Sequence, residues 1–318
     1  MDMTSNSTSH DRPLKVTILL GIHNGADHLN AQLKSISRQS HANWHLICSD
    51  DGSTDNSLAI LSDFAKSHPG QVTLNVGPCR GFSHNFMSMI CALPKDAGYV
   101  NFADQDDVWH PEKLARALRQ LNNIGSAPAL YCGRQTYWYP TTNRQVASPE
   151  MKRPFTLRNA LIENVATGNT IMLNPAAARL AQHAACRTPS VFAHDWWLYL
   201  LMTATGGIVH FDNGSPAIFY RQHPRNVIGA GKGLLAQIHR KSGVLRGVFS
   251  RRIDGNLQAL FAIEDLMTPQ ARDICRRFSQ ARRKSTLARL AAMRRISLYR
   301  QHRADTLGYW GAASLGRL

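Results

Sequence analysis

Short apolar runs and amphipathic segments alternate along the first two fifths of the chain. Residues 15–22, KVTILLGI, are mostly apolar and rich in β-branched side chains, which is typical of a strand buried on both faces of a parallel sheet. Residues 27–39 place Leu29, Leu33 and Ile36 at helical spacing. The alternation continues, with strands predicted at 44–49, 72–76 and 99–103 and a helix after each. Four such units predict an α/β fold with a mostly parallel sheet.

The pattern is less regular in the second half of the chain. An aromatic run at 129–139 predicts a strand, and a helix is predicted over 194–203. Beyond Gly233 the spacing is helical to about Arg303, and Pro269 begins a new helix because proline is tolerated in the first helical turn. Further short strands are predicted at 168–173, 208–211 and 217–221. In the helix after the second strand, the apolar face is predicted to carry Leu58, Leu61 and Phe64.

Charge divides the chain unevenly. The 318 residues carry a formal net charge of +16, yet residues 232–318 alone hold 18 Lys and Arg against 5 acidic residues. This shift follows the glycines at 229, 231 and 233, and it predicts a nearly neutral globular domain followed by a basic, helical arm. A basic arm could attract nucleic acid or an anionic membrane surface.

Composition indicates a folded protein of the cytosol. Hydrophobic residues make up 43% of the chain and charged residues 18%, enough apolar content for a sizeable core. The longest apolar runs are far shorter than the roughly 18–20 residues of a membrane span, and the polar N-terminus lacks the apolar region of a signal peptide. The six cysteines form no C-x-x-C pair, so we expect buried, reduced thiols.

Acidic residues follow two of the predicted strands. Asp50 and Asp51 lie at the carboxyl end of the second strand, where open α/β sheets bind ligands, although D-D-G-S-T-D could equally be a turn and a helix cap. Asp104, Asp106 and Asp107 follow the fourth strand. Three carboxylates this close repel one another unless a cation offsets their charge, and Mg²⁺ or Mn²⁺ commonly bridges such groups to phosphates. The alternative is a solvated acidic loop.

Two further segments carry candidate chemistry. Asp195 opens the aromatic stretch HDWWLY, where it either caps a helix or acts as a general base whose proton affinity is raised by its apolar surroundings. In YRQHP, Arg221 could bind phosphate through two parallel hydrogen bonds, and neutral His223 could ligate a metal. A single histidine is also commonly a structural residue.

Taken together, these segments resemble one enzyme family. VTILLGIHNG with SDDGSTDNS, FADQDDVWHPEKL, HDWWL and YRQHPRNVIG follow one another in the order found in family 2 glycosyltransferases of the GT-A fold. The forms D-Q-D-D-V-W, H-D-W-W and Y-R-Q-H are most similar to the rhamnosyltransferase-like branch that builds bacterial surface polysaccharide. The resemblance implies a GT-A domain at 14–230, with a Rossmann-like, mostly parallel sheet flanked by helices, and leaves 231–318 as the basic helical arm.

The resemblance also implies how a nucleotide-sugar donor is held. His23, Asn24 and Asp51 would contact the nucleobase and ribose, although His23 stands where the family commonly has a tyrosine. Asp104 would support the ribose or the water shell of the metal.

For the reaction itself, Asp106 would bind a divalent cation, Mg²⁺ or Mn²⁺, on the donor diphosphate, and His223 would complete the metal coordination. Asp195 would be the catalytic base. A single base acting opposite the leaving group implies displacement with inversion at the anomeric carbon.

The implied partners are a nucleotide sugar, with dTDP-L-rhamnose favoured, and a glycan or lipid-linked acceptor. A peripheral position at the inner face of the plasma membrane follows if the arm binds anionic lipid. Two alternatives remain. A nucleotidyltransferase would need a Gly-rich, basic phosphate loop where this chain has HNGADH, and a nucleic-acid-binding protein would leave the acidic turns unexplained, so no nucleic acid is expected.

Overall fold

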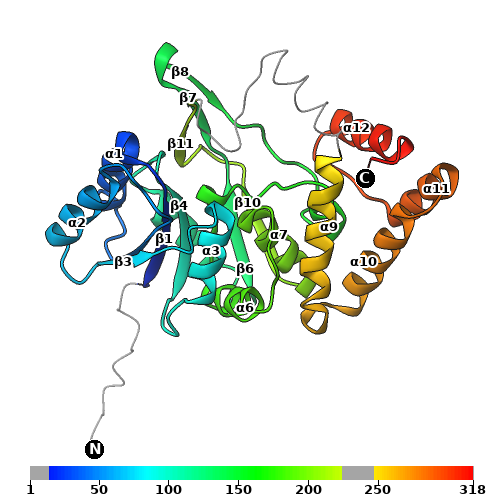
Figure 1. Ribbon diagram of the computed structural model, residues 1–318, viewed down its shortest axis with the longest axis horizontal. Helices are drawn as coiled ribbons and strands as arrows, with labels where there is room; N and C mark the ends of the chain where they lie inside the picture. The colour runs from blue at the N-terminus through cyan, green and yellow to red at the C-terminus, as the bar shows by residue number, and fades with distance from the viewer. Residues whose placement is uncertain (1–13, 224–246, 318) are drawn as a thin grey trace, which may run out of the picture.

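The computed structural model of the protein describes residues 14–223 and 247–317, and Figure 1 shows a twisted central sheet with helices on both faces. Seven strands form this sheet in the order β10-β6-β9-β4-β1-β2-β3. All neighbours run parallel except β9, which is antiparallel to both β4 and β6. The α/β class and the mostly parallel sheet are therefore confirmed. The strands are β1 (Val16–Ile22), β2 (Trp44–Asp50), β3 (Val72–Val76), β4 (Tyr99–Asp104), β6 (Ala129–Gly133), β9 (Met172–Leu173) and β10 (Ile208–Asp212).

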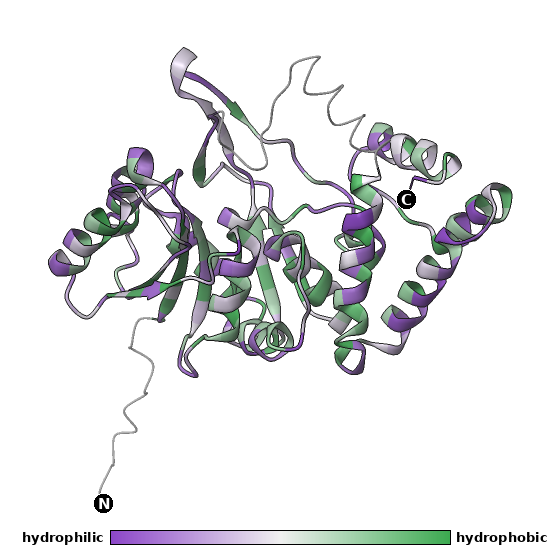
Figure 2. Cartoon of the chain, in the orientation of Figure 1, coloured by the Kyte–Doolittle hydropathy of each residue, from purple (hydrophilic) through white to green (hydrophobic). Residues whose placement is uncertain are grey.

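Helices follow the predicted strands in the first half of the chain. Strand β1 is buried along nearly its whole length because α1 and α3 cover the sheet around it. Figure 2 shows apolar residues gathered in the central strands and in α7, with polar residues on the outer helices. The helices before the arm are α1 (Ala26–Ser37), α2 (Ser57–Ser67), α3 (Phe82–Cys91), α4 (Lys113–Asn122), α5 (Leu157–Ala160), α6 (Pro175–Ala185) and α7 (His194–Thr205).

A small second sheet stands above the main one in Figure 1. Its strand order is β5-β11-β7-β8, built from β5 (Val108–Trp109), β7 (Thr136–Tyr139), β8 (Arg144–Ala147) and β11 (Ile218–Arg221). Strand β5 follows the acidic turn after β4, and β11 leads to His223. The small sheet thus brings two distant candidate segments to the same edge of the main sheet.

The described part of the basic arm, residues 247–317, is largely helical, as predicted, and it packs on the α/β domain. Helices α9 (Val248–Phe261), α10 (Pro269–Arg282), α11 (Thr286–Ile296) and α12 (Arg303–Ser314) lie at the end of the molecule opposite α1 and α2 (Figure 1). Leu260 and Phe278 are fully buried in the same apolar cluster as Trp197 of α7. The expected boundary between residues 230 and 231 lies outside the described residues.

Polar contacts also fasten the arm. The Tyr299 hydroxyl donates to the carbonyl of Pro154, and the backbone N–H of Gln301 donates to the Glu163 carboxylate at 2.6 Å. The guanidinium of Arg153 lies 4.2 Å from the Tyr299 ring centroid, in cation–π contact. The arm is therefore joined to the sheet domain by both apolar and polar contacts.

Three local predictions were wrong. Residues 129–139 do not form one strand, because the chain turns after Gly133 and sends β6 and β7 into different sheets. Residues 168–173 begin as a 3₁₀ turn, η2 (Gly168–Thr170), and only the last part pairs as β9. Leu58 is 51% exposed, because the buried stripe of α2 runs through Ser57 and Leu61 instead.

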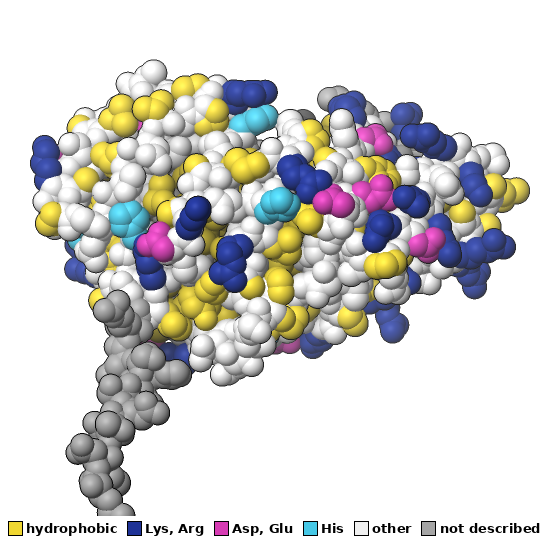
Figure 3. Space-filling view, turned by 90° about the horizontal axis from the view of Figure 1, so that it is seen from below, with side chains coloured by type: hydrophobic (Ala, Val, Ile, Leu, Met, Phe, Trp, Pro, Cys, Tyr) yellow, Lys and Arg dark blue, Asp and Glu magenta, His cyan; other side chains and the backbone are white. Residues whose placement is uncertain are grey.

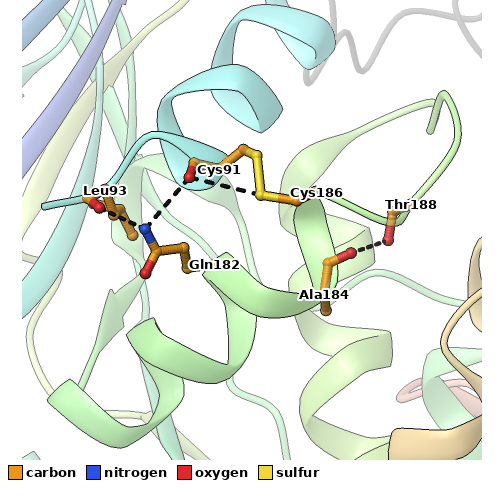
Figure 4. Close-up of a disulfide and its surroundings, with 6 residues drawn as sticks. All are labelled: Cys91, Leu93, Gln182, Ala184, Cys186 and Thr188. Atoms are coloured by element: carbon orange, nitrogen blue, oxygen red, sulfur yellow. Dashed lines mark hydrogen bonds between the residues drawn. A yellow bond between two sulfur atoms is a disulfide. The ribbon is translucent and has the colours of Figure 1, made fainter. Parts of the chain in front are cut away.

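The cysteine prediction was also partly wrong. Cys91 at the end of α3 and Cys186 just after α6 form a disulfide (Figure 4). The two positions are 95 residues apart, so no local spacing signals the pair. The helices α3 and α6 pack side by side, and Gln182 donates to the carbonyls of Cys91 and Leu93 beside the disulfide. Of the other four cysteines, three are buried and free as expected, whereas Cys79 is exposed.

Candidate active site

The loop after β1 is tied to two neighbouring loops at the carboxyl edge of the sheet. The carboxamide of Gln105 receives the His23 N–H at 2.9 Å and donates to the His23 carbonyl at 3.0 Å. Asn24 has a left-handed φ of 49°, and its side-chain oxygen accepts the Thr54 N–H at 2.8 Å. A Cβ at Gly25 would collide with the Gln105 carboxamide, so a larger residue there would displace the Gln105 side chain from the His23 backbone. The Asn24 side chain therefore orders the loop itself.

Asp51 holds the loop that follows β3. Its two carboxylate oxygens accept the N–H groups of Cys79 and Gly81, each at 2.7 Å, and the residue is only 6% exposed. The ring nitrogen Nδ1 of His23 lies 3.2 Å from the Asp51 carbonyl oxygen. Thus the three residues expected at the nucleoside lie together, and Asp51 fixes the loop after β3 beside them.

Gly77 leaves space for this arrangement. A Cβ there would lie 2.9 Å from Asp51 Oδ1, 2.8 Å from Asn85 Oδ1 and 3.0 Å from the Asp50 carbonyl oxygen. Contacts this short force buried neighbours to move.

We expect Gly77→Ala to lower the free energy of unfolding by about 1–3 kcal/mol, the usual cost of overpacking, and to weaken nucleotide binding by displacing Asp51. Urea denaturation and calorimetric titration with a nucleoside diphosphate measure the two effects. Gly255→Ala is the matched control. It lies within α9 with no atom near its added methyl group, and should stabilise the protein by roughly 0.5–1 kcal/mol. Equal effects of the two substitutions would contradict this account.

The three carboxylates of the acidic turn after β4 differ in their exposure to solvent. Asp104 and Asp106 are partly exposed, whereas Asp107 is fully buried and accepts the Asn169 side-chain N–H at 2.6 Å. Burial, together with the charges of Asp106 and Asp195, raises the pKa of Asp104 to about 7. Asp104 is therefore close enough to both Asp106 and Asp195 to be repelled by their charges.

Asp106 meets the end of the small sheet. His223 Nε2 lies 2.7 Å from Asp106 Oδ2, and Arg221 Nε donates to the Asp106 carbonyl at 3.1 Å. The Arg221 guanidinium lies 4.3 Å from the Trp138 ring centroid, which helps to orient it. Two residues 115 and 117 positions away from Asp106 thus converge on it, and the resemblance implied that Asp106 and His223 would share a site.

Asp195 lies in the first turn of α7, beside the turn η2 that leads into β9. Its carboxylate accepts the Trp196 N–H at 2.6 Å and the Gly168 N–H at 3.1 Å. It is 8% exposed, and burial raises its pKa to about 6 despite those hydrogen bonds. A carboxylate with a pKa near the working pH is suited to accept a proton.

His194, next to Asp195, belongs to the core. Its ring stacks on Phe86 with centroids 4.0 Å apart and lies 5.4 Å from that of Phe102. Burial lowers the pKa of His194 to about 3, so the imidazole is neutral. Only the acid of the H-D pair is therefore available for proton transfer.

The side chains of Asp106 and His223 suit a divalent cation that takes its remaining ligands from phosphates and water. Within residues 14–223 and 247–317, no three His, Cys, Asp or Glu side chains are arranged to hold a metal ion. His223 Nε2 and Asp106 Oδ2, which contact each other at 2.7 Å, could nevertheless supply two ligands. Mg²⁺ and Mn²⁺ commonly bind to one or two protein ligands and complete their shell with substrate phosphates and water.

All eight site residues predicted from the sequence lie at the carboxyl edge of the main sheet or on the small sheet beside it. The sequence argument missed residues that act through hydrogen bonds across the chain, namely Gln105, Asn169 and the loop 77–81. Only the loop carried a signal, since Gly77-Pro78 and Gly81 mark a turn after a strand.

Comparison with known proteins identifies the family. The family model described as glycosyl transferase family 2 matches residues 17–178, which include β1 to β4, Asp51, Asp104 and Asp106. This chain belongs to glycosyl transferase family 2. The match ends before Asp195, Arg221 and His223, so those residues rest on the geometry described above.

Relatives of this family 2 glycosyltransferase include a named rhamnosyltransferase. The dTDP-rhamnosyl transferase RfbG of Shigella flexneri is 26% identical over 242 residues, covering 73% of this chain and 81% of that protein. A second relative is the UDP-Glc:alpha-D-GlcNAc-diphosphoundecaprenol beta-1,3-glucosyltransferase WfgD of Escherichia coli. It is 29% identical over 112 residues, covering 34% of this chain and 42% of that protein.

Solved structures share the fold of this family 2 glycosyltransferase. S. aureus TarS 1-349 in complex with UDP-GlcNAc superposes with a TM-score of 0.59 at 14% identity, covering 96% of this chain and 89% of that one. The mannosyltransferase PcManGT of Pyrobaculum calidifontis, in complex with GDP-Man and Mn²⁺, superposes with a TM-score of 0.51 at 18% identity, covering 96% and 88%. These similarities confirm the predicted GT-A fold.

Proposed function

We propose that this protein is an inverting glycosyltransferase that moves a sugar from a nucleotide-diphosphate donor to an acceptor hydroxyl in polysaccharide synthesis. One observation carries the proposal. The buried carboxylate of Asp195, whose pKa is raised to about 6, lies close enough to Asp104 for its charge to raise the pKa of Asp104, and Asp106, two residues further on, pairs with His223. A candidate proton acceptor thus lies near a candidate diphosphate site.

Each residue then has a task. His23, Asn24 and Asp51 would contact the nucleobase and ribose, and Asp104 would support the ribose or the water shell of the metal. Asp106 and His223 would hold a divalent cation, and Arg221 would donate to the phosphates. When bound, the cation neutralises the negative charge that develops on the departing diphosphate.

Asp195 performs the proton transfer. Its ionised carboxylate takes the proton of the acceptor hydroxyl as that oxygen attacks the anomeric carbon. The C–O bond to the diphosphate breaks on the opposite face of the sugar. With one base and no second carboxylate acting as nucleophile, no covalent sugar–enzyme intermediate forms, and the anomeric configuration inverts.

For the donor we propose dTDP-L-rhamnose, supported by the named activity of the Shigella relative. The purified protein should consume this donor faster than UDP- or GDP-sugars of the same concentration, as followed by mass spectrometry. An NMR spectrum of the first product should show the opposite anomeric configuration to the donor. Retained configuration would contradict the mechanism, whichever sugar is transferred.

For the acceptor we propose a glycan or lipid-linked saccharide, reached from the cytoplasmic face of a membrane. No helix within the described ranges combines the length and the apolar character that crossing a bilayer requires. Figure 3 shows Lys and Arg side chains gathered at the end of the molecule formed by α10–α12. Arg294 and Arg295 of α11 are exposed and form no ion pair with described acidic residues, and Leu287 on the same helix is 83% exposed. This composition suits an anionic lipid surface.

We therefore expect the protein to co-sediment with vesicles containing anionic lipid at low salt and to dissociate at high salt. The double variant Arg294→Gln and Arg295→Gln should bind about 30-fold more weakly, because each basic residue near such a surface contributes about 1 kcal/mol. The control removes Lys66 and Arg119, two exposed cations outside the arm. Equal binding by both variants would show that the arm is not the docking surface.

A further inference from the structure

A chain of buried contacts connects the acidic turn to Asp195. Asp107 follows Asp106 directly and is fully buried. Its Oδ2 atom accepts the side-chain N–H of Asn169, at 2.6 Å, and Asn169 is itself only 1% exposed. Asn169 lies in the middle of η2, whose first residue, Gly168, donates its N–H to Asp195. Two hydrogen bonds and one peptide unit thus separate Asp107 from Asp195.

The turn that transmits this contact is itself well fixed. Thr170 closes η2 by donating both its N–H and its hydroxyl to the Thr167 carbonyl, at 2.9 and 2.7 Å. The carbonyl of Ile171, the next residue, accepts the Phe102 N–H of β4 at 3.2 Å. Because these hydrogen bonds hold the turn rigid, a displacement of Asn169 also displaces Gly168.

The turn η2 also packs closely against the start of α7, beside Asp195. A Cβ at Gly168 would lie 3.0 Å from His194 Nε2 and 3.5 Å from the Asp195 Cβ. The backbone of η2 thus approaches α7 closely, and this approach puts the Gly168 N–H within reach of the carboxylate. The only polar side-chain contact described from η2 toward the acidic turn is the one made by Asn169.

We propose that Asn169 is a positioning residue that couples the acidic turn to the catalytic base, by holding η2 on Asp107 so that the Gly168 N–H orients the Asp195 carboxylate. This inference rests on the proposed role of Asp195 as the base. It accounts for two features that the proposed mechanism does not use, the inward-facing Asp107 and the buried amide opposite it. It also links the arrangement of the donor site to that of the base.

The test compares Asn169→Ala with a control that loses an equivalent buried amide elsewhere. Asn174 is 2% exposed and makes three hydrogen bonds at the start of α6, near the beginning of β6 and so at the opposite edge of the sheet. Asn174→Ala should lower the melting temperature but leave turnover, its pH profile and the pKa of Asp195 unchanged.

Asn169→Ala should reduce kcat for hydrolysis of dTDP-L-rhamnose by at least about 10-fold, since small displacements of a catalytic group have large effects on rate. The Kd for dTDP should change by less than about threefold. Weakening the Gly168 hydrogen bond disfavours the ionised carboxylate, so the pKa of Asp195 should rise by roughly half a unit to one unit. Asp107→Asn should keep kcat near that of the wild type, because its amide oxygen still accepts the Asn169 N–H, whereas Asp107→Ala should resemble Asn169→Ala.

A ¹³C NMR titration of the free protein labelled at aspartate carboxyls makes the result independent of the transferase activity. The Asp195 resonance is identified by its absence in Asp195→Asn. An unchanged pKa of Asp195 in Asn169→Ala would overturn the inference, as would equal kinetic effects of Asn169→Ala and Asn174→Ala. If the wild type consumes no nucleotide sugar, the proposed function fails, while the titration still decides whether Asn169 controls Asp195.

Discussion

Asp195→Asn is expected to abolish sugar transfer while leaving nucleotide binding intact. The carboxylate, proposed as the base for the acceptor hydroxyl, accepts the N–H groups of Trp196 and Gly168 and makes no described hydrogen bond to the loops proposed to border the nucleoside. An asparagine has the same shape but cannot take the proton of an attacking hydroxyl. General-base catalysis typically contributes 10²–10⁴-fold, so kcat should fall by about that factor.

Calorimetric titration with dTDP and a coupled assay for released dTDP separate binding from turnover. Asp273→Asn, an exposed acid paired with Arg277 in the arm, is the matched control and should keep full activity. The melting temperature of Asp195→Asn should stay the same or rise, because the substitution removes a buried charge. Lost dTDP binding in a folded Asp195→Asn protein would assign the residue to the donor site instead.

The same carboxylate predicts how activity depends on pH. Burial raises the pKa of Asp195 from 3.8 to about 6, so the base becomes protonated as the pH falls through 6, and turnover should drop about tenfold per unit below it. Asp104, with a pKa of about 7, interacts with Asp195, so the acidic limb of the profile reports both groups. Because both pKa values are raised on folding, ionisation of these acids destabilises the fold as the pH rises through this range.

The sequence predicted the sheet and its edge well because the determining signals are local. Buried parallel strands appear as apolar runs, and acidic residues directly after them must lie at the carboxyl edge. The amino-acid sequence alone therefore sufficed to place Asp51 and the acidic turn 104–107 at the same edge of the sheet. The resemblance to family 2 glycosyltransferases added the proposed roles of Asp195 and His223, which lie beyond the residues matched by the family model.

The remainder depended on contacts between residues far apart in the chain. The Cys91–Cys186 pair spans 95 residues, and Asn169 lies 62 residues from Asp107, so neither leaves a local pattern. The division of 129–139 between two sheets was hidden for a different reason. Its aromatic residues on both sides of Gly133 favour a strand, and the pairing of β7 with β11 decides where the second part goes.

Asp106→Asn is expected to lower turnover by about 10²–10³-fold, the effect typical of removing one main stabiliser of transition-state charge. The Asp106 carboxylate is partly exposed and 2.7 Å from His223 Nε2, and it adjoins Asp104, whose pKa it helps to raise. An asparagine keeps an oxygen ligand but removes the negative charge, so affinity for a divalent cation should fall. Asp63→Asn, an exposed acid on α2, should have no effect.

Chelation tests the same site without a substitution. Excess EDTA should inactivate the wild type, and Mn²⁺ or Mg²⁺ should restore turnover, with Asp106→Asn and His223→Ala both needing higher metal concentrations. Electron paramagnetic resonance of Mn²⁺ in the presence of dTDP should show tight binding to the wild type and weaker binding to both variants, because the diphosphate and the two side chains share the ion. Full turnover in EDTA would contradict the metal site, and the charge of the leaving diphosphate would then have to be met by the guanidinium of Arg221, which lies against the acidic turn.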